Sequence, residues 1–203
     1  MEFLSLENIK ELAHQYGYWS VFFGIAIENT GIPIPGETIT IVGGFFAGSG
    51  ELNYWLVLIS AVMGAVLGDN FGYWLGRIGG WSLFLKIAKF FRLQEEELSK
   101  AKTKFSDNAG KAVFFGRFIT LLRVFAGPIA GIVEMPYPKF LFYNFCGAAV
   151  WASVIVTISY FVGRIIPLSQ LVGIIAQFGI IALLLVVAWI VIPLIIKAKK
   201  QAN

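Results

Sequence analysis

Two stretches of this chain are apolar enough to enter a membrane but too short and too interrupted to cross it as a helix. Residues 28–37 are broken by two glycines and two prolines, and residues 115–131 are broken by Gly127, Pro128 and Gly131. A spanning helix needs about 20 apolar residues in succession, and irregular backbone at membrane depth is tolerated only where protein or water covers it. Each stretch therefore predicts a re-entrant hairpin, which enters the membrane and returns to the same side.

Both stretches carry charges, and these charges are of opposite sign. The first holds Glu28 and Glu37, and the second holds Arg117 and Arg123. A charged side chain at bilayer depth costs from about 3 to over 10 kcal/mol, so charges that persist there usually mark a functional site. A guanidinium pairs with two phosphate oxygens at once, whereas a carboxylate can pair with the guanidinium or take up a proton. We expect Arg117 and Arg123 to bind a lipid phosphate and Glu28 and Glu37 to gate that binding by protonation; the alternative is an ion-pair cluster that only stabilises the fold.

The composition indicates a membrane location for the chain as a whole. Hydrophobic residues make up 58% of it and charged residues 14%, compared with about 25% charged residues in soluble domains. Long apolar runs predict transmembrane helices at residues 52–77, 138–164 and 170–197. Several crossings make the protein multi-pass.

Motifs of the first half of the chain recur in the second half. Glu51-Leu-Asn-Tyr54 matches Glu134-Met-Pro-Tyr137, 83 residues later, and Tyr73-Trp-Leu-Gly-Arg77 matches Tyr160-Phe-Val-Gly-Arg164, 87 residues later. A hairpin plus one span crosses the membrane an odd number of times, so two such copies must have opposite orientations. The predicted fold class is an all-α membrane protein with an inverted repeat of a re-entrant helical hairpin plus a transmembrane helix, followed by a C-terminal transmembrane helix, an arrangement that recurs in transporters.

These predictions divide the chain into consecutive segments. They are an interfacial amphipathic helix at 1–14, a first repeat at 15–77 (hairpin 15–50, helix 52–77), an amphipathic connector at 78–111, a second repeat at 112–164 (hairpin 112–135, helix 138–164), a C-terminal helix at 170–197 and a tail at 198–203. Lysine and arginine are concentrated in the connector and near the C-terminus, which predicts that both are cytoplasmic. The N-terminal helix would then lie on the outer face.

The span at 52–77 carries two further patterns. Glycine recurs every fourth residue from Gly64 to Gly76, which allows the backbone of another helix to approach closely. Asp69, Tyr73 and Arg77 line a neighbouring face, and we expect them to support the site. Asp69 is a charge inside the span, and two interpretations stay open for it: a structural ion pair that holds the span against a hairpin, or a direct part of the site.

The order of these motifs resembles that of the DedA family, whose membrane proteins share the VTT (SNARE-associated) domain. The matching motifs are Glu28-Asn-Thr-Gly31, Pro35-Gly-Glu37, Gly68-Asp-Asn-Phe-Gly-Tyr-Trp-Leu-Gly-Arg77, Gly116-Arg-Phe118 with Arg123, and Asn144 followed by Gly147-Ala148 and Trp151. The resemblance covers about residues 15–195. It implies opposed re-entrant hairpins in the bacterial inner (plasma) membrane, functional acids at Glu28 and Glu37, functional bases at Arg117 and Arg123, and a supporting role for Asn144.

The resemblance also implies lipid translocation. Bacterial members of the family are associated with recycling undecaprenyl phosphate or moving phosphatidylethanolamine, and eukaryotic relatives act as scramblases. Many members have proline between the two arginines, where this chain has Thr120. We therefore expect a flippase or scramblase for a phosphate-bearing lipid, coupled to protons.

Two other function classes stay open: a transporter of ions or small cations, of the proton antiporter type, and a membrane enzyme. The chain has one histidine, His14, and one cysteine, Cys146, and so lacks a His or Cys cluster for a metal or a nucleophile. We expect no catalytic residue, metal or cofactor. The expected partners are phosphate-bearing lipids and protons; nucleic acid is not expected because the basic residues lie beside membrane segments, and a homo-oligomer stays open.

Overall fold

The computed structural model describes residues 6–32, 34–90, 96, 99–100, 103, 108–167 and 170. Its helices are α1 (Leu6–Asn29), α2 (Gly36–Gly48), α3 (Tyr54–Phe90), α5 (Ala109–Gly116), α6 (Thr120–Ile132) and α7 (Tyr137–Ile165). The chain divides into two compact units, at 1–164 and 165–203, and the described elements belong almost wholly to the first. The predicted C-terminal helix at 170–197, beyond its first residue, and the tail at 198–203 lie outside the described residues.

The regular structure of the described residues is entirely helical, which confirms the all-α class. Two segments among them, Tyr54–Trp81 of α3 and Tyr137–Ile165 of α7, are long and apolar enough to cross a membrane. They correspond to the spans predicted at 52–77 and 138–164.

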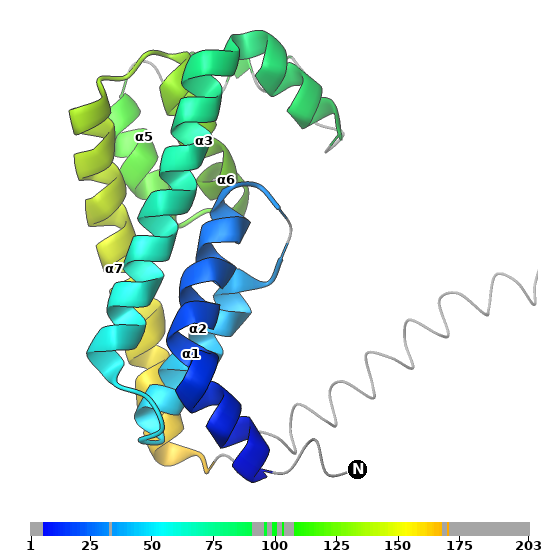
Figure 1. Ribbon diagram of the computed structural model, residues 1–203. Coiled ribbons are helices and arrows are strands. Elements are labelled where there is room, and N and C mark those ends of the chain that lie inside the picture. Colours follow the sequence, from blue (N-terminus) through cyan, green and yellow to red (C-terminus); the bar gives the residue numbers. More distant parts are fainter. Residues whose placement is uncertain are drawn as a thin grey trace, which may run out of the picture. The chain divides into compact units, whose positions relative to one another are not determined.

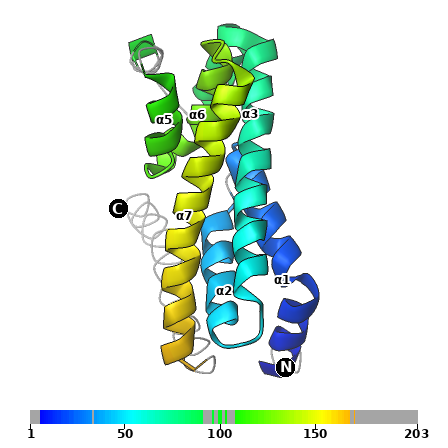
Figure 2. The same ribbon diagram turned by 90° about the vertical axis from the view of Figure 1, so that its left-hand side faces the viewer.

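Two helical hairpins lie along different halves of these long helices. α1 and α2 form one hairpin beside the N-terminal half of α3, and α5 and α6 form the other beside its C-terminal half (Figure 1). α7 runs past both hairpins, with α2 beside one end and α5 beside the other (Figure 2). The two hairpins therefore approach each other near the middle of α3.

The turn of the first hairpin depends on glycine and on a carboxylate. Gly31 has φ 99°, a conformation that glycine adopts without strain, and it ends α1 together with Thr30, whose hydroxyl donates to the carbonyl of Ile27 at 2.6 Å. The Glu28 carboxylate accepts the N–H of Glu37 at 2.9 Å. The first N–H groups of a helix have no partner within that helix, so Glu28 caps α2 from the preceding helix.

The glycine stripe of α3 contacts two helices in succession. A Cβ at Gly64 or Gly68 would overlap backbone carbonyls of α1, and a Cβ at Gly76 would overlap the carbonyl of Pro128 in α6. Close approach of another backbone was the prediction from the glycine spacing. The structure adds that one stripe serves both hairpins, because α3 passes from α1 to α6 along its length.

Two helix crossings in the structure have the same construction. A Cβ at Gly48 of α2 would overlap the carbonyl oxygen of Tyr160 in α7, and a Cβ at Gly131 of α6 would overlap the carbonyl oxygen of Tyr73 in α3. Each tyrosine also contacts a tyrosine that begins the other long helix: the ring centroids of Tyr54 and Tyr160 are 5.3 Å apart, and those of Tyr73 and Tyr137 are 5.6 Å apart.

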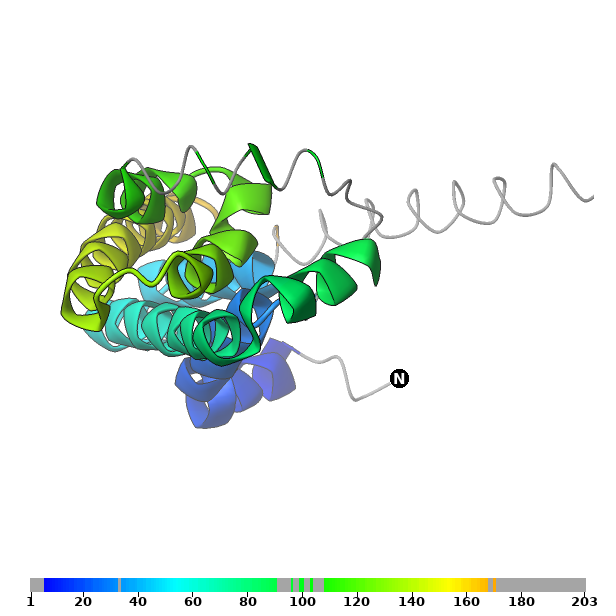
Figure 3. The same ribbon diagram turned by 90° about the horizontal axis from the view of Figure 1, so that it is seen from above.

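Two element boundaries differ from the sequence prediction. α1 is continuous from Leu6 to Asn29, so the structure places no break at residue 14, where the interfacial helix was expected to end. α3 continues beyond residue 77 to Phe90, with non-helical backbone at Gly80 (φ 61°). The helix turns away at this glycine (Figure 3), so the beginning of the predicted connector is a helical extension of the span.

Candidate functional site

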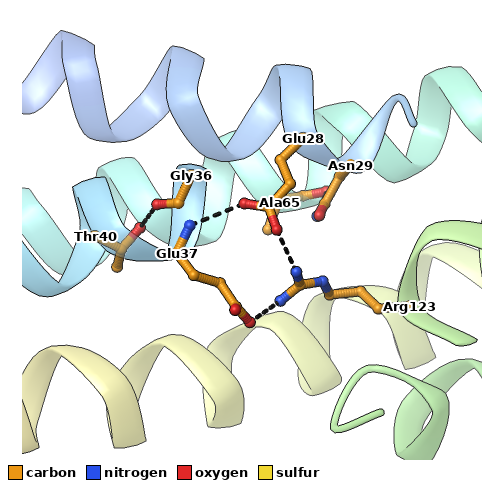
Figure 4. Close-up of polar contacts among 7 residues, drawn as sticks. All are labelled: Glu28, Asn29, Gly36, Glu37, Thr40, Ala65 and Arg123. Atoms are coloured by element: carbon orange, nitrogen blue, oxygen red, sulfur yellow. Dashed lines mark hydrogen bonds and ion pairs between the residues drawn. The ribbon is translucent and has the colours of Figure 1, made fainter. Parts of the chain in front are cut away.

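Arg123 joins the two hairpins. It lies in the first turn of α6, and its terminal nitrogens donate to two carboxylates of the first hairpin: Nη2 to Glu28 at the end of α1 and Nη1 to Glu37 at the start of α2 (Figure 4). The Arg123 side chain is 2% exposed, whereas that of Glu37 is 41% exposed. The guanidinium is thus held inside the protein, and one of its two partners reaches the surface.

Arg117 has different partners from different elements. It lies in the turn between α5 and α6, where Phe118 N–H bonds to the Phe115 carbonyl at 3.1 Å. Its Nη2 donates to Asp69 of α3 and to Asn144 Oδ1 of α7 at 2.6 Å. Arg117 therefore ties the second hairpin to both long helices, and its partners are almost completely buried.

The two arginines share one narrow crevice. Its polar lining consists of Asp69, Arg117, Arg123 and Asn144, and the space between them is too small for a water molecule. Three polar atoms of this group have no hydrogen-bond partner within the described part of the chain: Asp69 Oδ1, Arg117 Nη1 and Arg123 Nε. The site holds two guanidinium groups and three carboxylates, so full ionisation would leave one excess negative charge.

The remaining predicted supporting residues lie apart from these charges. The Tyr73 hydroxyl donates to the Met135 carbonyl at 2.6 Å, and its ring stacks on Phe140 with centroids 4.5 Å apart. Arg77 is exposed, at the end of the span where Gly131 packs. The structure thus joins Glu28, Glu37, Asp69, Arg117, Arg123 and Asn144 into a site, and it places Tyr73 in the core and Arg77 at the periphery.

A model of the VTT domain matches residues 34–161. The match covers well over half of the chain and contains both arginines, Glu37, Asp69 and Asn144. The chain belongs to the DedA family of VTT-domain membrane proteins. Glu28 lies just outside the matched range, although its contacts place it in the same site.

Relatives of this DedA-family protein cover most of its length. A membrane protein of Synechocystis sp. is 59% identical over 189 residues, which is 93% of this chain and 87% of the relative. Protein DedA of Escherichia coli is 31% identical over 172 residues, 80% and 77% of the two chains. A Lactococcus lactis relative that carries the name alkaline phosphatase-like protein is 30% identical over 200 residues, 96% and 92% of the two chains. No solved structure matches the chain.

One residue of the site was not among the predicted site residues. The Arg123 guanidinium carbon lies 5.5 Å from the centre of the Trp151 ring, within the range of a cation–π contact. Trp151 belongs to one of the motifs that resemble the family, but an aromatic residue in the apolar sequence of α7 gives no sign that it faces a charge. Thr120, where the resemblance led us to expect proline, is the first residue of α6, a position that accepts proline because its N–H needs no helical partner.

Proposed function

We propose that this DedA-family protein is a flippase or scramblase that carries a phosphate-bearing lipid, such as undecaprenyl phosphate or a phospholipid, across the bilayer. The observation that carries the proposal is the arrangement around Arg123. Both of its terminal nitrogens point at carboxylate oxygens, from Glu28 and Glu37, and a phosphate presents two oxygens to the same fork. Binding of the lipid head group would replace the carboxylates at the junction of the two hairpins.

An inverted repeat would place this junction in the middle of the membrane. In its support, α2 packs on α7 as α6 packs on α3: Gly48 meets Tyr160 as Gly131 meets Tyr73. These pairs follow the sequence offsets of 83 and 87 residues. In this proposal both hairpins are re-entrant and enter from opposite sides, as transporters built from inverted repeats require.

Proton coupling follows from the charges. When a phosphate takes the place of Glu28 and Glu37 on Arg123, the site gains a further negative charge in a protein interior that disfavours it. Protonation of the released carboxylates relieves this excess. Lipid binding and proton uptake would therefore be linked, and a proton gradient could drive the cycle.

Two alternatives have specific support. The excess of one carboxylate over the guanidinium groups favours a transporter of protons or small cations. The name of the Lactococcus lactis relative directs attention to hydrolysis of phosphate esters. We propose transport of a lipid rather than catalysis, and the same purified protein can be assayed for all three activities.

The test uses proteoliposomes that contain a fluorescent phospholipid, with head-group accessibility measured at several pH values. We expect wild type to move the lipid and both Arg123→Ala and Glu37→Gln to reduce that movement, with Glu37→Gln also removing its pH dependence. Parallel measurements follow cation flux and phosphate release. Equal lipid movement by wild type, Arg117→Ala and Arg123→Ala would contradict the proposal.

A further inference from the structure

We propose that the two arginines have different parts in the proposed transport: Arg123 is the ligand of the phosphate, and Arg117 is a fixed cation that stays paired with Asp69 and Asn144. We further propose that Trp151 is a positioning residue, which keeps the Arg123 guanidinium in place when its carboxylates leave. This inference rests on the proposed function and names the residues by which phosphate is bound.

The partners of Arg123 can leave it without becoming isolated. Glu28 also accepts the Glu37 N–H at 2.9 Å, so its carboxylate keeps a place at the N-terminus of α2, where negative charge is favoured. The Glu37 side chain is 41% exposed, so it is not enclosed by packed protein, and protonation can remove its charge once it leaves Arg123. Each carboxylate makes one contact with the guanidinium, from the neighbouring hairpin, so a small displacement of this hairpin would free both nitrogens together.

Asp69, the charged partner of Arg117, has no such alternative among the described residues. The Asp69 side chain is 6% exposed, and its second oxygen, Oδ1, has no hydrogen-bond partner among the described residues. Separating Arg117 from Asp69 would leave a buried carboxylate without a countercharge, which is strongly destabilising. Asn144 holds the same nitrogen of Arg117 at 2.6 Å. Arg117 can therefore attract a phosphate by its charge, but it is already bound to two long helices.

The Arg123 guanidinium carbon lies over the Trp151 ring, 5.5 Å from its centre, while both terminal nitrogens of the guanidinium donate to carboxylates. The tryptophan is 6% exposed and lies in α7, whereas both carboxylates lie in the first hairpin. A cation–π contact is compatible with in-plane hydrogen bonds of the same guanidinium. The Arg123 guanidinium would therefore keep its orientation while phosphate oxygens replace the carboxylates as its hydrogen-bond acceptors.

The test measures binding to the purified full-length protein in detergent by native mass spectrometry. The probe is dioctanoyl phosphatidic acid, dioctanoylglycerol is the control without phosphate, and inorganic phosphate is the competitor. We expect Arg123→Lys to weaken phosphatidic acid binding by about tenfold or more, because a point charge replaces the fork. Arg117→Lys should bind within about threefold of wild type but melt at a lower temperature.

Two further comparisons separate ligand binding from structural support. The double variant Arg117→Gln/Asp69→Asn removes a cation and its countercharge together, and it should keep phosphatidic acid binding if Arg117 is not a ligand. Trp151→Leu should weaken binding by about three- to tenfold, whereas Trp151→Phe, which keeps an aromatic face, should restore most of it at a comparable melting temperature.

The outcomes distinguish this inference from the function on which it rests. If wild type binds phosphatidic acid no better than dioctanoylglycerol, the proposed function itself is wrong. If wild type discriminates but Arg117→Lys and the double variant lose binding as much as Arg123→Lys does, the division between the arginines is wrong. Weak competition by inorganic phosphate supports a lipid head group as the ligand; competition at equal affinity would assign the site to free phosphate instead.

Discussion

Asp69 and Arg117 form an ion pair that is closed off from solvent and that connects α3 with the second hairpin. Removing water from two such charges is costly, and a buried pair is stable only with close contact and additional hydrogen bonds. Asn144 supplies one such bond. At the scale of single residues, the site therefore contains one enclosed ion pair and, around Arg123, a second group in which Glu37 is partly exposed.

The first prediction concerns Asp69. Asp69→Asn should lower the free energy of unfolding by about 3 kcal/mol, because it leaves the Arg117 guanidinium buried without its countercharge. The measurement is thermal unfolding in detergent, with Glu96→Gln as the control, since the Glu96 side chain is 76% exposed in its pair with Lys100. A variant as stable as wild type that transports nothing would instead assign Asp69 a direct role in transport.

The second prediction concerns pH and the loop between α2 and α3. The hydrogen bond from Lys10, at 2.5 Å, with a smaller contribution from His14 at 2.9 Å, holds the pKa of the Glu51 carboxyl below its usual value. A lowered pKa in the folded state means that this pair stabilises the protein at neutral pH and that the stabilisation is lost as pH falls through that pKa. Glu51→Gln should therefore lower stability at pH 7 by less than about 1 kcal/mol.

The measurement compares melting temperatures at pH 7 and pH 3.5. The difference between Glu51→Gln and wild type should shrink at the lower pH, which lies below the usual pKa of a glutamate carboxyl, and the exposed Glu11→Gln variant serves as the control. A difference that persists unchanged in acid would show that the carboxylate charge is not what stabilises this loop.

Glycine determines how closely the helices approach each other at the scale of elements. α6 lies against α3 through Gly127 and Gly131, and α2 lies against α7 through Gly44 and Gly48. These contacts bring backbone against backbone, a kind of packing common among membrane helices, where lipid removes much of the hydrophobic drive for association. The position of each crossing also determines where the arginines and carboxylates meet.

The third prediction tests these crossings as a matched pair. Gly131→Ala and Gly48→Ala should each destabilise the protein by about 1–3 kcal/mol, the usual effect of overpacking, because the new methyl group would overlap the carbonyl oxygen of Tyr73 or Tyr160. Gly116→Ala is the control, since its Cβ would meet its nearest neighbours at 3.7 Å. Unfolding in detergent measures all three, and equal stability of all variants would rule out close backbone contact at these crossings.

At the largest scale, the main feature of the first compact unit is that its two hairpins meet. Residues 28–37 and 117–123 are far apart in the sequence, and ion pairs join them. If the hairpins are re-entrant, neither tip reaches either aqueous phase directly. The charged site would then be separated from both aqueous phases and would not form part of a continuous pore.

The fourth prediction tests this arrangement by labelling. In a Cys146→Ala background, Ile34→Cys and Leu121→Cys should react slowly with large aqueous thiol reagents from either side of the membrane, because both positions lie near hairpin tips. Tyr54, at the start of α3, provides the matched control as Tyr54→Cys, which should react more rapidly from one side. Labelling of both tip positions at the rate of a solvent-exposed cysteine would contradict the re-entrant hairpins.

Much of this arrangement could be predicted from the sequence, and the exceptions have physical reasons. Charges within short, broken apolar stretches led to Glu28, Glu37, Arg117 and Arg123, because such charges are costly in a membrane. The sequence left open which acid pairs with which arginine, since pairing depends on the rotation of each helix. Trp151 stands in one of the motifs of the family resemblance, but its contact with Arg123 could not be predicted, because an aromatic residue in an apolar helix is equally suited to lipid, core or a cation.

Two other differences come from patterns that have more than one structural solution. Glutamates among apolar residues near the N-terminus suggested a separate interfacial helix, but an amphipathic start can also continue into the following apolar helix, as in α1. Tyr73 and Arg77 share the spacing of Asp69, yet the stagger of α6 against α3 brings Asp69 to the arginines, Tyr73 to Met135 and Arg77 to the end of α6.

The glycine stripe of α3 has a consequence for how chains of this kind can change in length. Gly64 and Gly68 face α1, and Gly72 and Gly76 face Pro128 of α6. One residue inserted between Gly68 and Gly72 would rotate the following part of α3 by about 100° about the helix axis. Gly72 and Gly76 would then no longer face α6, and the two hairpins would lose their present orientation relative to each other. Because α3 sets the angle of both hairpins through these glycines, we expect a one-residue insertion or deletion between Gly64 and Gly76 to be tolerated less well than a substitution of a lipid-facing side chain of the same segment.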